Sequence, residues 1–187
     1  TSYMYVTGPD VVKTVTNEEV THETLGGASV HAAKSGVVDG AFENDIEALT
    51  QMRRLIDFLP GSNREEPPVR PSFDTIERQD DSLDTLIPDT PNQPYDMHEV
   101  IKKTVDEGSF FEIQPAHAAN IICGFGRVEG RTVGVVANQP MVLAGVLDAD
   151  ASRKAGRFVR FCDCFGITLV TFVDVPGFLP GVDQEYG

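Results

Sequence analysis

The chain has 187 residues, of which 41% are hydrophobic and 24% charged, with a formal net charge of −14 at pH 7. This length suffices to bury one sizeable core, the hydrophobic fraction excludes wholesale disorder, and every apolar run is shorter than the ~18 residues of a membrane span. The acidic surplus, 29 Asp and Glu against 15 Lys and Arg, argues against nucleic-acid binding, and three cysteines favour a reducing compartment.

The first sixty residues predict a short strand followed by helices. Residues 3–7 read as the strand, and Pro9 suits the first turn of a helix that ends near Val15. Asn17 is predicted to be the N-cap of a further short helix, because two glutamates follow it and suit the positive end of a helix.

Helical spacing continues after a break at Gly26-Gly27. Residues 28–34 predict one or two helical turns, and residues 45–58 predict an amphipathic helix. The apolar residues of that helix at helical spacing are Ile46, Leu49, Met52, Leu55, Ile56 and Leu59.

The composition changes between Pro60 and Pro94, a stretch that contains seven of the twelve prolines. Residues 61–96 carry nine acidic and three basic side chains and few apolar ones. Such a segment cannot bury enough apolar surface to fold alone, so it is predicted to be a linker that lies over the surface between two folded units.

A second unit with strands and helices is predicted from about Met97. Two apolar runs surround Glu129-Gly130, an X-Gly pair typical of a β-hairpin. A long helix and a continuous apolar strand follow, and the strand is expected to be buried on both faces. This order indicates an α/β sheet with a crossover helix. The predicted ranges are 98–106 (helix), 120–128, 131–137 and 167–173 (strands) and 149–165 (helix, with Ala151, Ala155, Phe158, Val159 and Cys162 inward).

The loop after the last strand, from Asp174 onward, is the most informative segment. It leaves the C-terminal end of a predicted buried strand, where open α/β sheets place their ligands. Two glycines and two prolines indicate an unusual backbone, while Phe178 and Leu179 are apolar residues in a loop. The pattern indicates a binding loop, and an ordinary structural turn is the alternative.

Three further segments are candidates for binding. The Gly26-Gly27 pair could offer backbone N–H groups beside His31, or form a helix-linking turn. The amides of Asn138 and Gln139 could bind a planar urea or amide, or merely open a polar loop. The cations Arg153, Lys154 and Arg157 (with Arg160 beyond) could bind the phosphates of a nucleotide-like cofactor, or lie on a solvated helix face.

The sequence shows no motif for a metal site or for several common classes of catalysis. Cys162 and Cys164 are two apart and have no second Cys pair or suitably spaced His, so buried inert thiols are favoured over a metal site. The sequence has no Walker loop, GxGxxG or GxSxG motif, which leaves phosphotransfer, dinucleotide redox chemistry and serine hydrolysis unsupported.

Five stretches of the chain resemble biotin-dependent acyl-CoA carboxyltransferases. They are TSYMYVTGPDVVK (1–13), LGGASVH (25–31), NQP (138–140), RFVRFCD (157–163) and FVDVPGFLPGVDQEYG (172–187). The last is long and specific, although relatives often carry a polar residue at the position of Val182. The resemblance covers nearly the whole chain and weakens in the linker.

This resemblance implies a crotonase-like (ClpP/crotonase) ββα superhelix, with the end of one half and the start of a second. It implies three parts: residues 1–60, the end of an N-terminal CoA-side domain; residues 61–96, the Pro-rich acidic linker; and residues 97–187, the start of a C-terminal biotin-side domain. The chain is accordingly expected to be an internal piece of a longer protein.

The reaction that the resemblance implies is transfer of a carboxyl group from carboxybiotin to propionyl-CoA, giving methylmalonyl-CoA. Biotin would be carried by a partner α subunit, the biotin carboxylase and carrier, which uses ATP and bicarbonate. The chain's own subunit would form a β hexamer within an α6β6 complex, in the bacterial cytoplasm or the mitochondrial matrix. Another acyl-CoA substrate (acetyl- or methylcrotonyl-CoA) and a non-catalytic crotonase-like module are the alternatives.

Site residues follow from the same resemblance. No catalytic residue and no metal ligand is expected within the chain, because the family's oxyanion Gly pairs would lie upstream of residue 1 and downstream of residue 187. The acyl-CoA side would comprise Gly26, Gly27, Ala28, Arg153, Lys154 and Arg157. The biotin side would comprise Asn138, Gln139, Pro176, Gly177, Phe178, Leu179 and Gly181.

Overall fold

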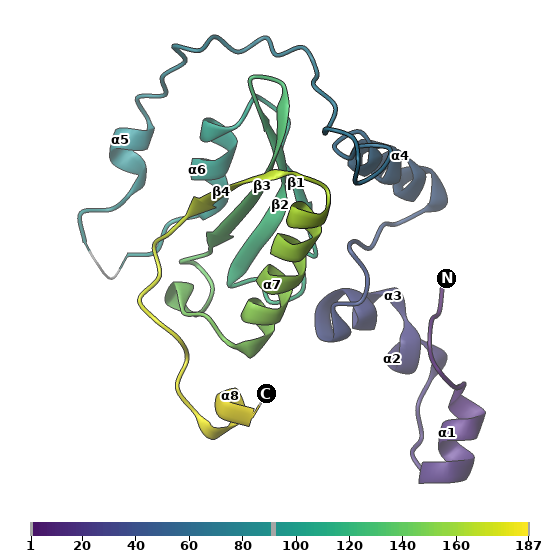
Figure 1. Cartoon of the computed structure of the whole chain (residues 1–187). Helices are drawn as coiled ribbons and strands as arrows, with labels where there is room; N and C mark the ends of the chain where they lie inside the picture. The colour runs from purple at the N-terminus through teal and green to yellow at the C-terminus, as the bar shows by residue number, and fades with distance from the viewer. Residues whose placement is uncertain (1, 91–92, 187) are drawn as a thin grey trace.

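A computed structural model describes residues 2–90 and 93–186. Thr1 and Gly187, which begin and end the resembling runs, lie outside these described residues, as do Pro91 and Asn92 of the linker. Figure 1 shows a sheet flanked by helices, a group of short helices at the N-terminus, and a long segment that arches between them. None of the helices within 2–90 and 93–186 is long and apolar enough to cross a membrane.

Short helices make up the N-terminal group. They are α1 (Pro9–Thr16), α2 (His22–Gly26), α3 (Ala28–Val30) and a π-helical turn over His31–Ser35, followed by the longer α4 (Asp45–Ile56). The helix predicted from Pro9 and the amphipathic helix from residue 45 are confirmed. Asn44 caps α4, since its side-chain oxygen accepts a hydrogen bond from the Glu47 N–H at 2.9 Å.

Two predictions for this group are wrong. Residues 3–7 form a single bridge between Tyr3 and Gly27 instead of a strand, because no ladder of paired residues extends from it. Asn17 ends α1 with a left-handed φ of 61° and is not an N-cap. Thr21 caps α2 instead, in a reciprocal capping box with Thr24.

The sheet has the strand order β1-β2-β3-β4. Its strands are β1 (Phe111–Ile113), β2 (Ile121–Val128), β3 (Arg131–Asn138) and β4 (Thr168–Phe172). The first two pairings are antiparallel and the last is parallel. The predicted hairpin is confirmed, and its turn residues Glu129 and Gly130 have φ of 51° and 77°, as a type I′ turn requires. The sequence pattern did not predict β1, which is only three residues long.

Helices cover both faces of the sheet. Helix α6 (Met97–Thr104) packs on one face, and α7 (Ala149–Cys164), the predicted crossover between β3 and β4, packs on the other (Figure 1). Side chains of β2 alternate between these faces, because Cys123 and Phe125 lie in the cluster under α7 whereas Ile122 lies in the cluster under α6. At Gly134 a Cβ would come within 2.6 Å of the Cys162 sulfur, so glycine there lets α7 approach closely.

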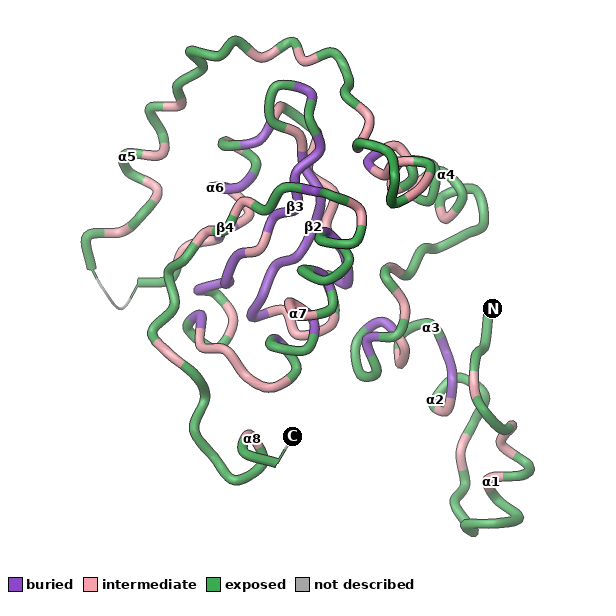
Figure 2. The backbone as a smooth tube through the Cα atoms, viewed as in Figure 1, coloured by how far each residue is buried: buried purple, intermediate pink, exposed green. Residues whose placement is uncertain are grey.

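The end of α4 and the residues after it belong to the cluster under α7. Phe58 is 1% exposed there, and Leu55 and Leu59 pack against the same cluster. Other apolar residues along the whole of α4 face outward, and Figure 2 shows much of the helix in the colour of exposed residues. The exposed apolar residues of α4 are Ile46, Leu49, Met52 and Ile56.

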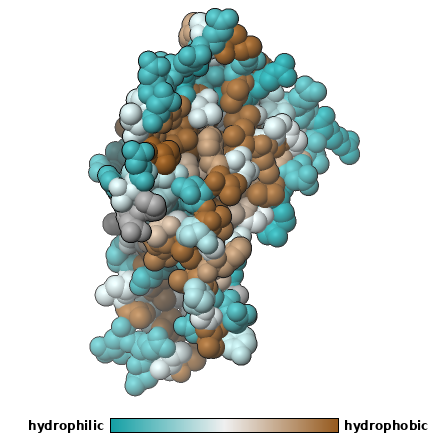
Figure 3. Space-filling view, turned by 90° about the vertical axis from the view of Figure 1, so that its left-hand side faces the viewer, coloured by the Kyte–Doolittle hydropathy of each residue, from teal (hydrophilic) through white to brown (hydrophobic). Residues whose placement is uncertain are grey.

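The prediction that the last strand is buried on both faces is wrong. Strand β4 is the edge strand of this sheet, and Leu169 is 37% exposed. Val173 just beyond the strand is 75% exposed. Figure 3 shows apolar side chains gathered over the middle of the molecule's face, bordered by hydrophilic ones. The inward prediction for α7 is confirmed for Ala151, Phe158 and Cys162, whereas Val159 is exposed.

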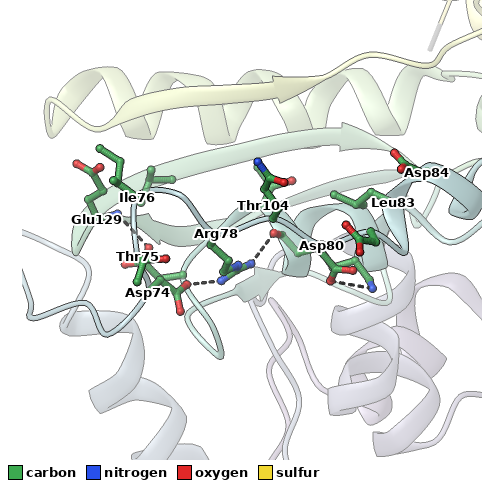
Figure 4. Close-up of a pocket in the computed structure, with 14 residues that line it drawn as sticks. Asp74, Thr75, Ile76, Arg78, Asp80, Leu83, Asp84, Thr104 and Glu129 are labelled. Carbon is green, nitrogen blue, oxygen red and sulfur yellow. Dashed lines mark hydrogen bonds and ion pairs between the residues drawn. The ribbon is translucent and has the colours of Figure 1, made fainter.

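Residues 61–90 arch over the sheet and include the short helix α5 (Leu83–Leu86) (Figure 1). Polar contacts tie the arch to the second unit, since the Arg70 N–H donates to the Gly130 carbonyl at 2.9 Å and Lys103 bonds Asp80 at 3.1 Å. Arg78 donates to the Asp74 carboxylate and to the Lys103 carbonyl (Figure 4). The linker is therefore fastened along its length, and beneath it lies a pocket of about 530 Å³.

Candidate functional site

The loop that follows β4 is held by the side chain of Asn138 at the end of β3. The Asp174 N–H donates to the Asn138 side-chain oxygen at 2.8 Å, and the Asn138 amide donates to the Asp174 carbonyl. Because β3 and β4 are parallel, their C-terminal ends meet at one edge, and the amide fastens the two chain segments there. Tyr95 adds a hydrogen bond of 2.6 Å to the Asp174 carboxylate.

Gln139 is enclosed by the start of α6. Its side-chain oxygen accepts from the Met97 N–H at 3.2 Å, and its amide donates to the Asp96 carboxylate at 2.7 Å. Asn138 and Gln139 are each 5% exposed. Both side-chain amides are thus hydrogen-bonded to protein atoms. The pair therefore positions the surrounding backbone and does not present a free amide to a ligand.

The loop itself pairs with the residues that precede α7. The Leu147 N–H donates to the Gly177 carbonyl at 3.1 Å, and the Leu179 N–H donates to the Leu147 carbonyl at 2.7 Å. Gly177 and Gly181 have φ of 151° and 146°, values that side chains with a Cβ rarely adopt. Phe178 is 74% exposed at the tip of the loop, so an apolar surface is held out to solvent on a fixed backbone.

A pocket of about 460 Å³ lies between this loop and the first turn of α7. Helix α8 (Val182–Tyr186) closes one side, where Gln184 accepts a hydrogen bond from the Ala149 N–H at 2.8 Å. Phe178, Leu179 and Arg153 line the pocket together. The structure therefore brings one predicted acyl-CoA residue, Arg153, next to two predicted biotin residues.

The glycine pair in the N-terminal group is buried and closely packed. A Cβ on Gly26 would clash with the Met4 carbonyl and the Tyr5 ring, which explains the need for glycine. The Gly27 N–H donates to the Glu23 carbonyl at 2.9 Å. The expectation that this N–H is open to a ligand is therefore wrong. Ala28 is exposed and lines a pocket of about 590 Å³.

His31 lies beside the glycine pair and is fully engaged. Its Nδ1 lies 2.9 Å from the Ser35 hydroxyl, and its Nε2 bonds the Met4 carbonyl. The histidine therefore fastens residues 4 and 31 to each other and holds the backbone that faces Ala28.

The three predicted cations do not form one cluster. Arg153 pairs with Asp150 at 3.0 Å on the surface, whereas Arg157 donates to the Gly36 carbonyl at 3.3 Å. Lys154 is only 3% exposed. The interpretation of Lys154 as a partner for cofactor phosphates is wrong, because all its N–H bonds point at backbone carbonyls inside the protein.

Four carbonyl oxygens surround the Lys154 ammonium. They belong to Gln114 (2.9 Å), His117 (2.8 Å), Ala118 (3.4 Å) and Ile121 (2.8 Å). Burial lowers the pKa of Lys154. A signal for this position was present in the sequence, because Lys154 lies three residues after Ala151 and four before Phe158, on the same helical face.

A second group that sequence reasoning missed is centred on His98. The ring bonds Glu112 on β1 at 2.9 Å through Nε2 and Asp96 at 2.7 Å through Nδ1. The hydrogen bond to Glu112, against the effect of burial, raises the pKa of His98. Burial acts to raise the pKa of Asp96, but hydrogen bonds from Gln139 and His98 outweigh it and lower that pKa. Spacing along the chain gave no sign of this contact.

The buried thiols are poor nucleophiles. Burial raises the pKa of Cys123 to about 12 and that of Cys162 to about 11, so both stay protonated at neutral pH. Within residues 2–90 and 93–186, no group of three His, Cys, Asp or Glu side chains is placed to hold a metal ion.

Comparisons with known proteins give one consistent result. The family of carboxyl transferase domains matches residues 1–187. The propionyl-CoA carboxylase beta chain of Cereibacter sphaeroides is 72% identical over all of this chain, which covers 37% of that relative. The human mitochondrial propionyl-CoA carboxylase beta chain is 55% identical, and 35% of it is covered.

A solved structure also matches. The crystal structure of transcarboxylase 12S, described as a hexamer assembly with hydrolysed methylmalonyl-coenzyme A bound, superposes with a TM-score of 0.94 at 46% identity. The match covers 98% of this chain and 36% of that one. The chain thus spans little more than a third of the length of the proteins it matches.

Proposed function

The chain belongs to the carboxyl transferase domain family, and on that premise we propose that it is part of a biotin-dependent propionyl-CoA carboxylase, in the carboxyltransferase β component. The predicted crotonase-like α/β fold is confirmed by the match to the transcarboxylase structure. The proposed reaction transfers a carboxyl group from carboxybiotin to the α-carbon of propionyl-CoA, and it yields methylmalonyl-CoA.

The proposed reaction depends on backbone N–H groups rather than on acidic or basic side chains. When bound, carboxybiotin would supply both the carboxyl group and the base that takes the α-proton of the thioester, so negative charge would develop on oxygens of both substrates. Two oxyanions must be stabilised in turn, and fixed backbone N–H groups do this without adding a competing base. The Gly pairs expected for this role would lie upstream of residue 1 and downstream of residue 187.

The observation that carries the proposal is the clamped loop after β4. Asn138 holds Asp174, Leu147 pairs with Gly177 and Leu179, and Phe178 is held outward over a pocket. We propose that residues 176–181 wall the biotin side of the site, with Asn138 and Gln139 holding that wall in place. Gly26, Gly27 and Ala28 would face the acyl-CoA, and Arg153 and Arg157 would attract its phosphates.

The wider assembly is part of the same proposal. Biotin would reach the site on a partner α subunit that uses ATP and bicarbonate. The β component would form a hexamer, in line with the hexamer named for the transcarboxylase relative. The boundaries 1–60, 61–96 and 97–187 are proposed for the two domain parts and the linker. Relatives from bacteria and from mitochondria support the cytoplasm or the mitochondrial matrix.

Carboxylation rates with three acyl-CoA substrates test the proposal. The complete β component with its partner should carboxylate propionyl-CoA faster than acetyl-CoA or butyryl-CoA. A preference for acetyl-CoA would mean that acetyl-CoA, and not propionyl-CoA, is the substrate. An intact assembly that carboxylates none of the three would favour a non-catalytic module.

A further inference from the structure

The arch is fastened where it passes the turn of the hairpin. The Arg70 N–H donates to the Gly130 carbonyl at 2.9 Å, and a Cβ on Gly130 would collide with the Arg70 carbonyl oxygen. Four residues further along, the Asp74 carboxylate accepts a hydrogen bond from the Glu107 N–H at 2.9 Å. The backbone of residues 70–74 therefore follows a fixed path beside the start of β3.

Two large apolar side chains of this fastened segment are exposed to solvent. Phe73 is 98% exposed and Ile76 is 84% exposed. Ile76 lines the pocket beneath the arch together with Val128 from the end of β2, and Figure 4 shows Ile76 beside Glu129 at one end of that pocket. We call Phe73, Ile76 and Val128 the arch patch. Apolar side chains that gather on a fastened surface segment are typical of a contact with another protein.

Acidic side chains surround the arch patch. Six acidic and two basic side chains line the pocket beneath the arch. The two basic ones, Arg78 and Lys103, are already paired with two of the acidic ones, whereas Asp81 and Glu129 form no ion pair within the described part of the chain. A partner surface with cations beside apolar side chains would complement this arrangement, and a second copy of the acidic arch would be repelled.

The arch patch and the proposed biotin wall lie at opposite ends of β3. The patch adjoins the turn just before Arg131, where β3 begins, whereas Asn138, where β3 ends, holds the loop after β4. Eight residues of extended strand span roughly 23 Å. A protein can therefore bind at the patch without covering the loop at residues 176–181.

We propose that the partner α subunit docks on the arch patch, through apolar side chains flanked by Lys or Arg. This inference rests on the proposed function, which supplies the partner. Phe73 and Ile76 form the apolar centre of the contact, and the carboxylates around them meet the partner's cations at its rim. The arch thus serves assembly and takes no part in carboxyl transfer.

Binding of the purified α subunit to the complete β component tests the proposal. The double variant Phe73→Ala, Ile76→Ala should raise the Kd for the α subunit at least about tenfold, because it removes both apolar anchors of the contact. Ile87 is also exposed on the arch but does not line the pocket. Ile87→Ala is therefore the matched control, and it should leave the Kd within about twofold of the wild-type value.

Charge reversal tests the acidic rim separately. Glu77 and Asp81 are exposed, and within the described residues neither side chain forms a hydrogen bond or an ion pair. The double variant Glu77→Lys, Asp81→Lys should slow association with the α subunit at least about tenfold at low salt, and by much less at about 0.5 M salt, which screens the charges. Asp89→Lys, further along the arch, should slow association by less than about threefold.

Carboxyl transfer from methylmalonyl-CoA to free biotin, measured without the α subunit, should be unchanged in both double variants. This readout shows that the variants are folded. Wild-type Kd values and association rates in both double variants overturn the docking surface. Loss of the β hexamer in size-exclusion chromatography also overturns it, because a second copy would then cover the patch. A wild-type β component that transfers no carboxyl group to free biotin overturns the proposed function instead, and the Kd values still decide where the α subunit binds.

Discussion

The ring of Phe58 stacks on the ring of Phe125, with centroids 5.8 Å apart and planes 23° from parallel. The Arg127 guanidinium lies 4.3 Å from the Phe58 ring centroid and also bonds the Asp57 carboxylate at 2.8 Å. Phe58, two residues beyond the end of α4, is therefore anchored in the core of the sheet, although its place in the sequence indicates the N-terminal part. The arch therefore starts at a position that packing in the core of the sheet fixes.

Phe58→Ala should lower the free energy of unfolding by about 3 to 5 kcal/mol, because it removes a ring that is 1% exposed and leaves a cavity beside Phe125. Chemical denaturation of the sheet unit, followed by its circular dichroism, measures this loss. Phe73 is 98% exposed, and Phe73→Ala should change the free energy by less than about 0.5 kcal/mol. Equal effects of the two variants would contradict the anchoring role.

Asn138→Leu should destabilise the edge at which β3 and β4 end. The substitution removes both hydrogen bonds to Asp174 and leaves its N–H and carbonyl without partners, which costs about 2 to 4 kcal/mol in total. Thermal denaturation measures the loss. Asn63→Leu, at an exposed position of the arch, serves as the control. A melting temperature unchanged by Asn138→Leu would show that the two hydrogen bonds between Asn138 and Asp174 do not contribute to stability.

Gly177→Val should reduce carboxyl transfer at least about tenfold while the assembly keeps its size. A β-branched residue cannot hold the φ of 151° without strain of about 1 to 3 kcal/mol, so the loop should leave its pairing with Leu147. Transfer rates and size-exclusion chromatography measure the two effects. Gly156→Ala in α7, where a Cβ meets no atom within 4 Å, should leave both unchanged. If assembly and carboxyl transfer were lost to the same extent, the role of the loop would be structural.

His98→Gln should destabilise the protein more at pH 6 than at pH 9. Glu112 and Asp96 raise the pKa of His98, so its contribution is complete below the unfolded value of about 6.5 and is lost as the pH rises through the folded value. The expected cost at pH 6 is about 1 to 3 kcal/mol, typical of charged hydrogen bonds. Denaturation at both pH values measures it, and a cost that does not depend on pH would exclude the charged pair.

Patterns among neighbouring residues predicted the hairpin and the main helices. The X-Gly turn at residues 129–130 predicted the hairpin, and the apolar spacing of residues 45–58 predicted α4. The position of α7 between two parallel strands followed from the order of elements. In each case neighbouring residues carry the information, through turn geometry or one helical face.

Contacts between distant residues could not be predicted in this way. The carbonyls around Lys154 come from a segment more than thirty residues away, and Glu112 reaches His98 across the sheet unit. The burial of the last strand was overestimated, because apolar composition alone does not show that β4 is an edge strand. For the loop at residues 174–181, composition indicated a fixed shape, while the amide that fixes it became apparent only in three dimensions.

The most direct test of the central claim uses the complete β component without its partner. The protein is incubated with methylmalonyl-CoA and free biotin, and the release of propionyl-CoA is measured with and without biotin. A carboxyltransferase should form propionyl-CoA at a rate that rises with biotin concentration, and Gly177→Val should abolish most of that rise. If the intact protein releases propionyl-CoA at the same rate without biotin, or releases none under either condition, the proposed carboxyl transfer is contradicted.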